Sequence, residues 1–305
     1  MSASNLLFLV MLILGPLVSV SSSSWPLCWA GMEVGFLGLI PLLLLGSVTS
    51  SKEASLKYFC VQALASVFLF LTGGVIFIFH GANIFYALGF ILSVSLKLGL
   101  FPGHFWVTSV IFGMDWVSCC LVLGPLKIPP FAFLSSFSET YPEYALGVLV
   151  LASLSAMMGA FLGNNQTNVR AMIGASSITH TGWMTLGCVF GGLWSYLAIY
   201  LVVLFLGLLF LWQKDNLAGA LSILSMSGLP PFIMFVAKLT IVANSLNYGA
   251  SFLFLSLPLL SAVLSLIFYL KFSYSFYLNE KSFPGKASIF ALGAVNLLGV
   301  IWVIL

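Results

Sequence analysis

The chain has 305 residues, of which 61% are hydrophobic and only 6% are charged, and its formal net charge is +3. An ordinary globular domain has roughly 25% charged residues, so this chain cannot build the water-facing surface of the two or three soluble domains that its length would allow. Composition therefore indicates a polytopic membrane protein.

Apolar runs near the ~20 residues needed to cross a ~30 Å hydrocarbon core recur along the chain. They are continuous rather than alternating, which predicts helices that satisfy their own backbone in lipid. We expect an all-α protein with one transmembrane domain over 1–305. Its eleven predicted helices span 5–20, 25–46, 57–79, 83–101, 114–136, 143–163, 168–189, 193–212, 217–244, 251–271 and 287–305.

Basic residues outside these helices lie on one side only. The loops after odd-numbered helices have no Lys or Arg, and one of them carries Glu139 and Glu143. The positive-inside rule places the even-numbered loops and the N-terminus on the cytoplasm-like side. The basic residues in or beside those even-numbered loops are Lys52, Lys57, Arg170, Lys214, Lys271, Lys281 and Lys286.

Four charged residues lie well inside predicted helices: Glu33, Lys97, Lys127 and Lys238. A lysine at mid-helix costs about 2.5–3.5 kcal/mol on insertion, whereas each Leu, Ile, Phe or Val returns about 0.3–0.6 kcal/mol. Insertion therefore tolerates these residues without explaining them, and such groups usually mark an ion path, a proton relay or a ligand site. Structural alternatives stay open: Lys97 could extend to the headgroups, and Glu33 could simply pair with a lysine. The same kind of structural role is an alternative for Lys127 and Lys238.

Two long segments contain a Pro-Pro pair beside an intramembrane lysine. These are "LGPLKIPPF", with Lys127, and "SGLPPFIMFVAKL", with Lys238. Proline removes a backbone donor and clashes with the preceding turn, so we expect two broken helices, the fifth and the ninth. Broken, charge-bearing helices are typical of transporter cores. An inverted repeat of five-helix units needs an odd offset, however, and these two helices are four apart.

The histidines and cysteines add one titratable candidate. His180 lies mid-helix in "GASSITHTGW", where it is either a hydrogen-bonded core residue or a proton relay. His80 is expected in a loop, and His104 follows the Lys97 helix. The five cysteines show no CxxC and no Cys/His metal spacing, and no glycine pattern for a dinucleotide is present. Energy for proton movement would therefore have to come from partner subunits.

Four strings, "SSKEASLKYFCVQALAS", "KLGLFPGHFWV", "NNQTNVRAMIGASSITHTGWM" and "LSMSGLPPFIMFVAK", resemble the NADH dehydrogenase subunit 2 family. These are mitochondrially encoded, antiporter-like membrane subunits of respiratory complex I, NADH:ubiquinone oxidoreductase. The likeness is specific from about Trp25 to Lys238. One departure concerns Leu126, because the family commonly has Gln before the second of its lysines, which puts the local hydration there in doubt.

The resemblance implies an antiporter-like fold with two broken helices and a proton relay driven by quinone reduction elsewhere in the complex. Glu33 and Lys97 would form a pair that holds or releases a proton as the carboxylate approaches or withdraws. Lys127 would be the connecting lysine on the first broken helix. His180 would be the central-axis histidine, and Lys238 the terminal lysine on the second broken helix.

The resemblance also implies partners and location. This chain would bind no cofactor, whereas other subunits would bind NADH, FMN, iron–sulfur clusters and ubiquinone. Neighbouring antiporter-like and small membrane subunits, accessory subunits and lipids such as cardiolipin would contact it in the mitochondrial inner membrane, and no nucleic acid would. The N-terminus would face the matrix. The alternatives are a stand-alone cation/proton antiporter, which shares the fold, and a structural scaffold, which would not need four intramembrane charges.

Overall fold

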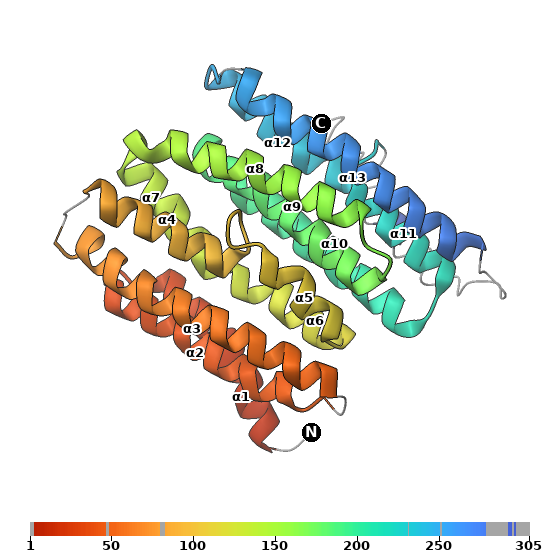
Figure 1. Ribbon diagram of the computed structural model, residues 1–305, viewed down its shortest axis with the longest axis horizontal. Helices are drawn as coiled ribbons and strands as arrows, with labels where there is room; N and C mark the ends of the chain where they lie inside the picture. Colours follow the sequence, from red (N-terminus) through yellow and green to blue (C-terminus); the bar gives the residue numbers. More distant parts are fainter. Residues whose placement is uncertain are drawn as a thin grey trace. The chain divides into compact units, whose positions relative to one another are not determined.

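The computed structural model describes residues 3–46, 49–79, 83–230, 232–250, 252–278, 292–294 and 296, and within these ranges the regular structure is helical (Figure 1). The chain divides into two compact units, Met1–Leu151 and Ala152–Leu305. The expectation of one domain over 1–305 stays a prediction.

The first unit contains a helical bundle. Its aromatic core is centred on Trp25, whose ring lies 5.0 Å from that of Phe77 and 5.3 Å from that of Phe133, between centroids. These contacts join α2, α3 and α7. The elements are α1 (Ala3–Ser21), α2 (Trp25–Leu44), α3 (Thr49–Phe77), α4 (Ile84–Leu98), α5 (Phe105–Gly113), α6 (Trp116–Leu123), the 3₁₀ turn η1 (Pro125–Lys127), α7 (Ile128–Thr140) and η2 (Pro142–Tyr144).

The second unit is built around α9 (Val169–Phe190), which is buried almost throughout and packs against α10, α12 and α13. Small and hydroxyl residues make α9 less hydrophobic than the helices α10, α12 and α13 that pack against it. This composition suits a helix that is buried in protein rather than in lipid. The other elements are α8 (Ala145–Asn164), which begins in the first unit, α10 (Leu193–Gln213), α11 (Asn216–Ser227), α12 (Ile233–Asn247) and α13 (Phe252–Leu278).

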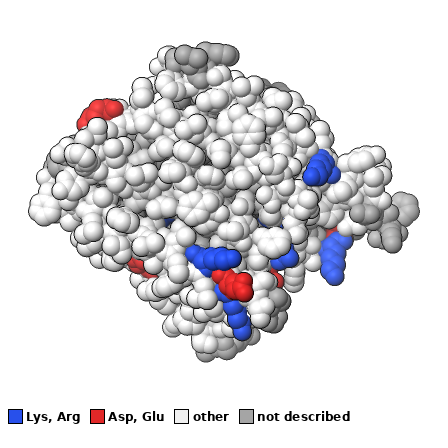
Figure 2. All heavy atoms as spheres, viewed as in Figure 1, with Lys and Arg blue, Asp and Glu red and all other residues white. Residues whose placement is uncertain are grey.

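The helices confirm the membrane class. Among the described residues, seven helical segments are long and apolar enough to cross a bilayer, and α4, α11 and α12 are shorter apolar helices. Many large apolar side chains lie on the outside, such as Phe79 (76% exposed) and Phe85 (78% exposed). Figure 2 shows few charged side chains on the face it presents. Ten of the predicted spans correspond to described helical segments, and the eleventh, 287–305, lies mostly outside the described residues.

Two breaks interrupt the helices at glycines with left-handed backbone. α4 ends at Gly99 (φ 73°), and α5 continues in the same direction after a short connection (Figure 1). α11 ends at Gly228 (φ 75°), and α12 follows it. Only glycine adopts this backbone readily. A Cβ on Gly99 would lie 2.3 Å from Val107 Cγ2, and one on Gly228 would lie 2.9 Å from Lys238 Nζ, so both sites also lack room for a side chain.

The fifth predicted span is interrupted, as expected, but the interruption lies before the Pro-Pro pair and not at it. Pro129 and Pro130 lie in the first turn of α7, where proline is well accommodated. The fifth predicted span is interrupted only by η1, which follows Gly124. The long break instead lies in the fourth predicted span, directly after Lys97. The second break lies in the ninth span, as predicted, so the two breaks are five spans apart and fit an inverted repeat.

Candidate functional site

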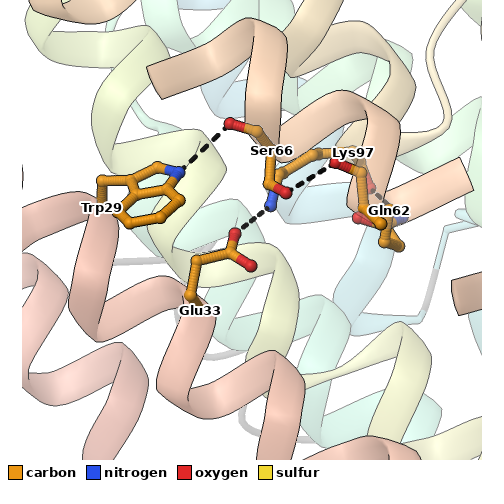
Figure 3. A network of polar contacts seen from close by, with 6 residues as sticks. Trp29, Glu33, Gln62, Ser66 and Lys97 are labelled. Carbon is orange, nitrogen blue, oxygen red and sulfur yellow. Dashed lines mark hydrogen bonds and ion pairs between the residues drawn. The ribbon is translucent and has the colours of Figure 1, made fainter. Parts of the chain in front are cut away.

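The first unit contains a buried ion pair beside its helix break. Lys97, in the last turn of α4, places Nζ 3.0 Å from Oε1 of Glu33 on α2 (Figure 3). The two side chains are 3% and 17% exposed, so the lysine is enclosed while the carboxylate is reached from one side. The Phe36 ring lies 5.9 Å from the same Nζ. The pairing implied by the resemblance is therefore present.

The backbone around the break is satisfied by side chains from neighbouring helices. Trp106 Nε1 on α5 donates to Leu96 O at 2.8 Å, and Gln62 Nε2 on α3 donates to Lys97 O at 3.3 Å. A helix end leaves carbonyls without intrahelical partners, and such groups are costly where no water reaches them. These two side chains thus allow α4 to end at membrane depth.

Lys127 lies close to the same site, at the end of η1 and the start of α7. Its side chain is 6% exposed and its Nζ is buried. Lys97 and Lys127 line one cavity of about 20 Å³, together with Tyr58, Gln62, Leu126 and other residues. That volume is enough for about one water molecule. Leu126 borders this cavity without a polar group, and Gln62 supplies an amide to it from α3.

The second unit places Lys238 against the other break. Lys238 lies on α12 and reaches back across the break, where Nζ donates to Ser227 O, the last residue of α11, at 2.7 Å. Its side chain is buried, and its Nζ lies 6.0 Å from the Trp183 ring of α9. This lysine is thus held by a backbone carbonyl and an aromatic face, in contrast to the carboxylate beside Lys97.

His180 is also buried, three residues before Trp183 on α9, and both of its ring nitrogens have hydroxyl partners. Nδ1 lies 2.9 Å from Tyr196 OH on α10, and Nε2 lies 3.1 Å from Tyr269 OH on α13. A second tyrosine of α10, Tyr200, packs its ring 5.1 Å from the imidazole. The hydrogen-bonded core alternative thus has its partners, and hydroxyls on both nitrogens also suit proton transfer.

The structure brings the predicted residues together in two sets. In the first unit Glu33 pairs with Lys97, and Lys97 shares a cavity with Lys127. In the second unit Lys238 Nζ lies near the Trp183 ring, and His180 lies on the same helix as Trp183. His80 lies outside the described residues. His104 lies in the break between α4 and α5, where its ring stacks on that of Phe101 at 5.8 Å.

Sequence reasoning missed the polar residues that surround the charges. Gln62 is a buried amide in a predicted transmembrane helix, which was a sufficient signal by itself. The tyrosines around His180 gave no such signal, because tyrosine is common in apolar helices and its hydroxyl partner is set by packing. The missed residues are Tyr58, Gln62 and Trp106 in the first unit and Ser176, Tyr196, Tyr269 and Ser227 in the second.

Comparison with known proteins identifies the family. Residues 22–212 match the family model described as NADH:quinone oxidoreductase/Mrp antiporter, transmembrane. The chain is 36% identical over 282 residues to NADH-ubiquinone oxidoreductase chain 2 of Albinaria caerulea, covering 92% of each chain. The chain belongs to the NADH-ubiquinone oxidoreductase chain 2 family. The homologue of the same name from Anopheles gambiae is 32% identical over 300 residues, covering 90% of this chain and 86% of that one.

Solved structures support the antiporter-like fold of this member of the NADH-ubiquinone oxidoreductase chain 2 family. A chain of respiratory complex I from Thermus thermophilus with bound aureothin aligns with a TM-score of 0.84 and 24% identity, covering 98% of this chain and 78% of that one. A chain of the Mrp complex from Dietzia sp. aligns with a TM-score of 0.81 and 17% identity, covering 90% and 61%. At these identities the likeness concerns the fold alone.

Proposed function

We propose that this chain is a core membrane-arm subunit of mitochondrial NADH:ubiquinone oxidoreductase and contributes a proton-translocation path. The observation that carries the proposal is the buried Lys97–Glu33 pair, which adjoins a helix break and shares a cavity with Lys127. A purely structural ion pair would not need a second buried lysine beside it. Burial of ions is costly unless they are paired and hydrogen-bonded, so function is the better account of this cluster.

The first step of the path is a proton exchange at Lys97. With Glu33 at 3.0 Å, the ammonium form of Lys97 is stabilised by the carboxylate. Withdrawal of Glu33 would leave the ammonium in an apolar enclosure and favour release of its proton. A water in the shared cavity would accept that proton and pass it to Lys127. Glu33 thereby acts as the control and the two lysines as the carriers.

The second unit would hold the continuation of the path, with His180 and Lys238 as its titratable groups. Imidazole exchanges protons near neutral pH, and Lys238 would be the terminal carrier. The arrangement of all five residues along one polar line in the membrane stays a prediction. No redox step is assigned to this chain, because NADH, FMN, iron–sulfur clusters and ubiquinone would be bound by other subunits, whose quinone chemistry would move Glu33.

The proposal includes location and partners. The chain would lie in the mitochondrial inner membrane with its N-terminus on the matrix side, in keeping with the basic even-numbered loops. Its apolar outer faces would contact neighbouring antiporter-like and small membrane subunits, accessory subunits and lipids such as cardiolipin. A stand-alone cation/proton antiporter is the competing function, and the Mrp complex shares the fold.

Two measurements test the proposal. On a native gel, the chain should migrate with a megadalton assembly that oxidises NADH, whereas a stand-alone exchanger would migrate as a small species without NADH oxidation. In sealed inner-membrane vesicles, Lys97→Met should leave the assembly intact and lower both proton pumping and coupled NADH:ubiquinone turnover. Lys52→Met, in the first turn of α3, is the matched control and should pump normally. Normal coupled turnover in Lys97→Met would remove Lys97 from the path.

A further inference from the structure

Four side chains of the second unit form a continuous chain of hydrogen bonds that contains His180. Ser176 Oγ lies 2.5 Å from Tyr269 OH, which lies 3.1 Å from His180 Nε2, and His180 Nδ1 lies 2.9 Å from Tyr196 OH. All four side chains are at most 2% exposed. We name Ser176, Tyr269, His180 and Tyr196 the hydroxyl–imidazole chain.

The chemistry of these groups gives the chain two complementary states. A neutral imidazole has one N–H donor and one acceptor nitrogen, and each hydroxyl donates one hydrogen bond and can accept others. In one state every bond points from Ser176 through Tyr269 and His180 to Tyr196. In the other, every bond points from Tyr196 through His180 and Tyr269 to Ser176. Every nitrogen and hydroxyl of the chain is used in both states.

The two states differ by the passage of one proton. A proton arrives at Ser176 Oγ, the Ser176 proton moves to the Tyr269 oxygen, and the Tyr269 proton moves to His180 Nε2. The Nδ1 proton then moves to Tyr196, whose own proton leaves. One proton has entered and one has left, no group has changed charge, and the imidazole has exchanged tautomers. Before a second proton can pass in the same direction, the hydroxyls must rotate back and the imidazole must return to its first tautomer, which requires the Nε2 proton to leave and another proton to bind at Nδ1.

The direction of the chain follows α9. Ser176 lies one turn before His180 on this helix, a rise of about 6 Å. Tyr196 lies in the first turn of α10, after the Gly191–Gly192 turn that follows the C-terminal end of α9. The hydroxyl–imidazole chain therefore extends along α9, a predicted transmembrane helix, rather than from one helix to the next in the membrane plane.

We propose that Ser176, Tyr269, His180 and Tyr196 form a proton wire along α9, with the two tyrosine hydroxyls as direct proton carriers. This proposal rests on the proposed function of the chain and adds a branch directed across the membrane.

The test uses the assembled complex in sealed inner-membrane vesicles and compares Tyr196→Phe and Tyr269→Phe with the parent. Each variant keeps the ring and removes one carrier. We expect protons pumped per NADH oxidised, or coupled turnover, to fall by roughly ten-fold or more in each, because positioned proton carriers typically contribute 10²–10⁴. The double variant should lose no more than either single one, because the carriers act in series. Tyr274→Phe, an exposed tyrosine of α13, is the control and should pump normally.

A second pair of variants decides the matter if the phenylalanine variants fail to assemble. Ser176→Ala removes the end of the wire, whereas Ser177→Ala removes a buried hydroxyl that donates only to Gly174 O within α9. We expect pumping to fall in the first and to persist in the second. Parental pumping in assembled Tyr196→Phe and Tyr269→Phe, or equal effects of the two serine variants, would overturn the wire. Absence of the parent chain from an NADH-oxidising assembly would instead refute the proposed function.

Discussion

The ion pair of Lys97 and Glu33 should respond unequally to removal of its two partners. Lys97 is 3% exposed and Glu33 is 17% exposed, so an unpaired lysine is trapped more deeply than an unpaired carboxylate. Removing one partner of a buried pair costs about 3–5 kcal/mol. Glu33→Gln keeps an oxygen that can accept from Nζ, which lowers the expected cost to about 3 kcal/mol. Lys97→Met leaves a carboxylate that is less deeply buried, so its expected cost is lower, at about 1–2 kcal/mol.

The double variant provides the decisive comparison. It removes both charges, so neither penalty for an unpaired ion remains. Its loss in the free energy of unfolding should therefore be about 2 kcal/mol smaller than the sum of the two single losses. For a chain of this size 1 kcal/mol corresponds to roughly 2 °C in midpoint temperature. Glu33→Gln should thus dissociate from the assembly about 6 °C below the parent, as followed by native gel after heating.

Coupled NADH:ubiquinone activity gives an independent reading of the same cycle. If Glu33 controls Lys97, the double variant should lose little more activity than either single variant, because the two residues act as a unit. Additive losses of both stability and activity would refute the interaction. The opposite order of the single variants, with Lys97→Met the less stable, would refute the argument from burial.

Two further predictions concern the helix breaks. Gly228→Ala should be destabilised by about 1–2 kcal/mol, because a Cβ strains the left-handed backbone and meets Lys238 Nζ. It should also reduce pumping. Gly74→Ala on α3, whose Cβ meets nothing within 4 Å, is the control and should assemble and pump as the parent does. Trp106→Phe leaves Leu96 O without its donor and should cost about 1–3 kcal/mol of stability. The variant should therefore dissociate from the assembly at a lower temperature than the parent. An unchanged temperature would show that water replaces the indole.

Much of the fold followed from composition, but the position of the first break did not. The scarcity of charged residues and the length of the apolar runs predicted the helices and their order. The hydrocarbon core of a bilayer both excludes charge and sets the length of a helix that crosses it. Pro129 and Pro130 were expected to interrupt the fifth predicted helix, yet they lie in the first turn of α7, where proline lacks only a donor that has no partner there anyway. The effective signal was Gly99 with Pro102 three residues later, since a left-handed glycine ends a helix where a proline cannot continue it.

The charged residues of the site were predicted from the sequence, whereas its neutral polar residues were not. Lys97, Lys127 and Lys238 are conspicuous because hydrocarbon penalises them, and Glu33 for the same reason. Tyr196 carries no such penalty in an apolar helix, so its role depends on a contact across helices that no local pattern specifies.

The two lysines at the breaks also differ in what holds their charge. Ser227 O belongs to the C-terminal end of α11, where aligned peptide dipoles produce a partial negative charge of roughly half an electron. That charge is part of the backbone, so it cannot take up a proton or swing away, and it is removed only if α11 itself unwinds. Lys238 thus faces a fixed partial negative charge of the backbone. Lys97 instead faces Glu33, whose side chain can move and can take up a proton. An energy input that moves side chains can therefore reset the first lysine, whereas the second must be reset by a change in its neighbours' protonation or by movement of the half-helix.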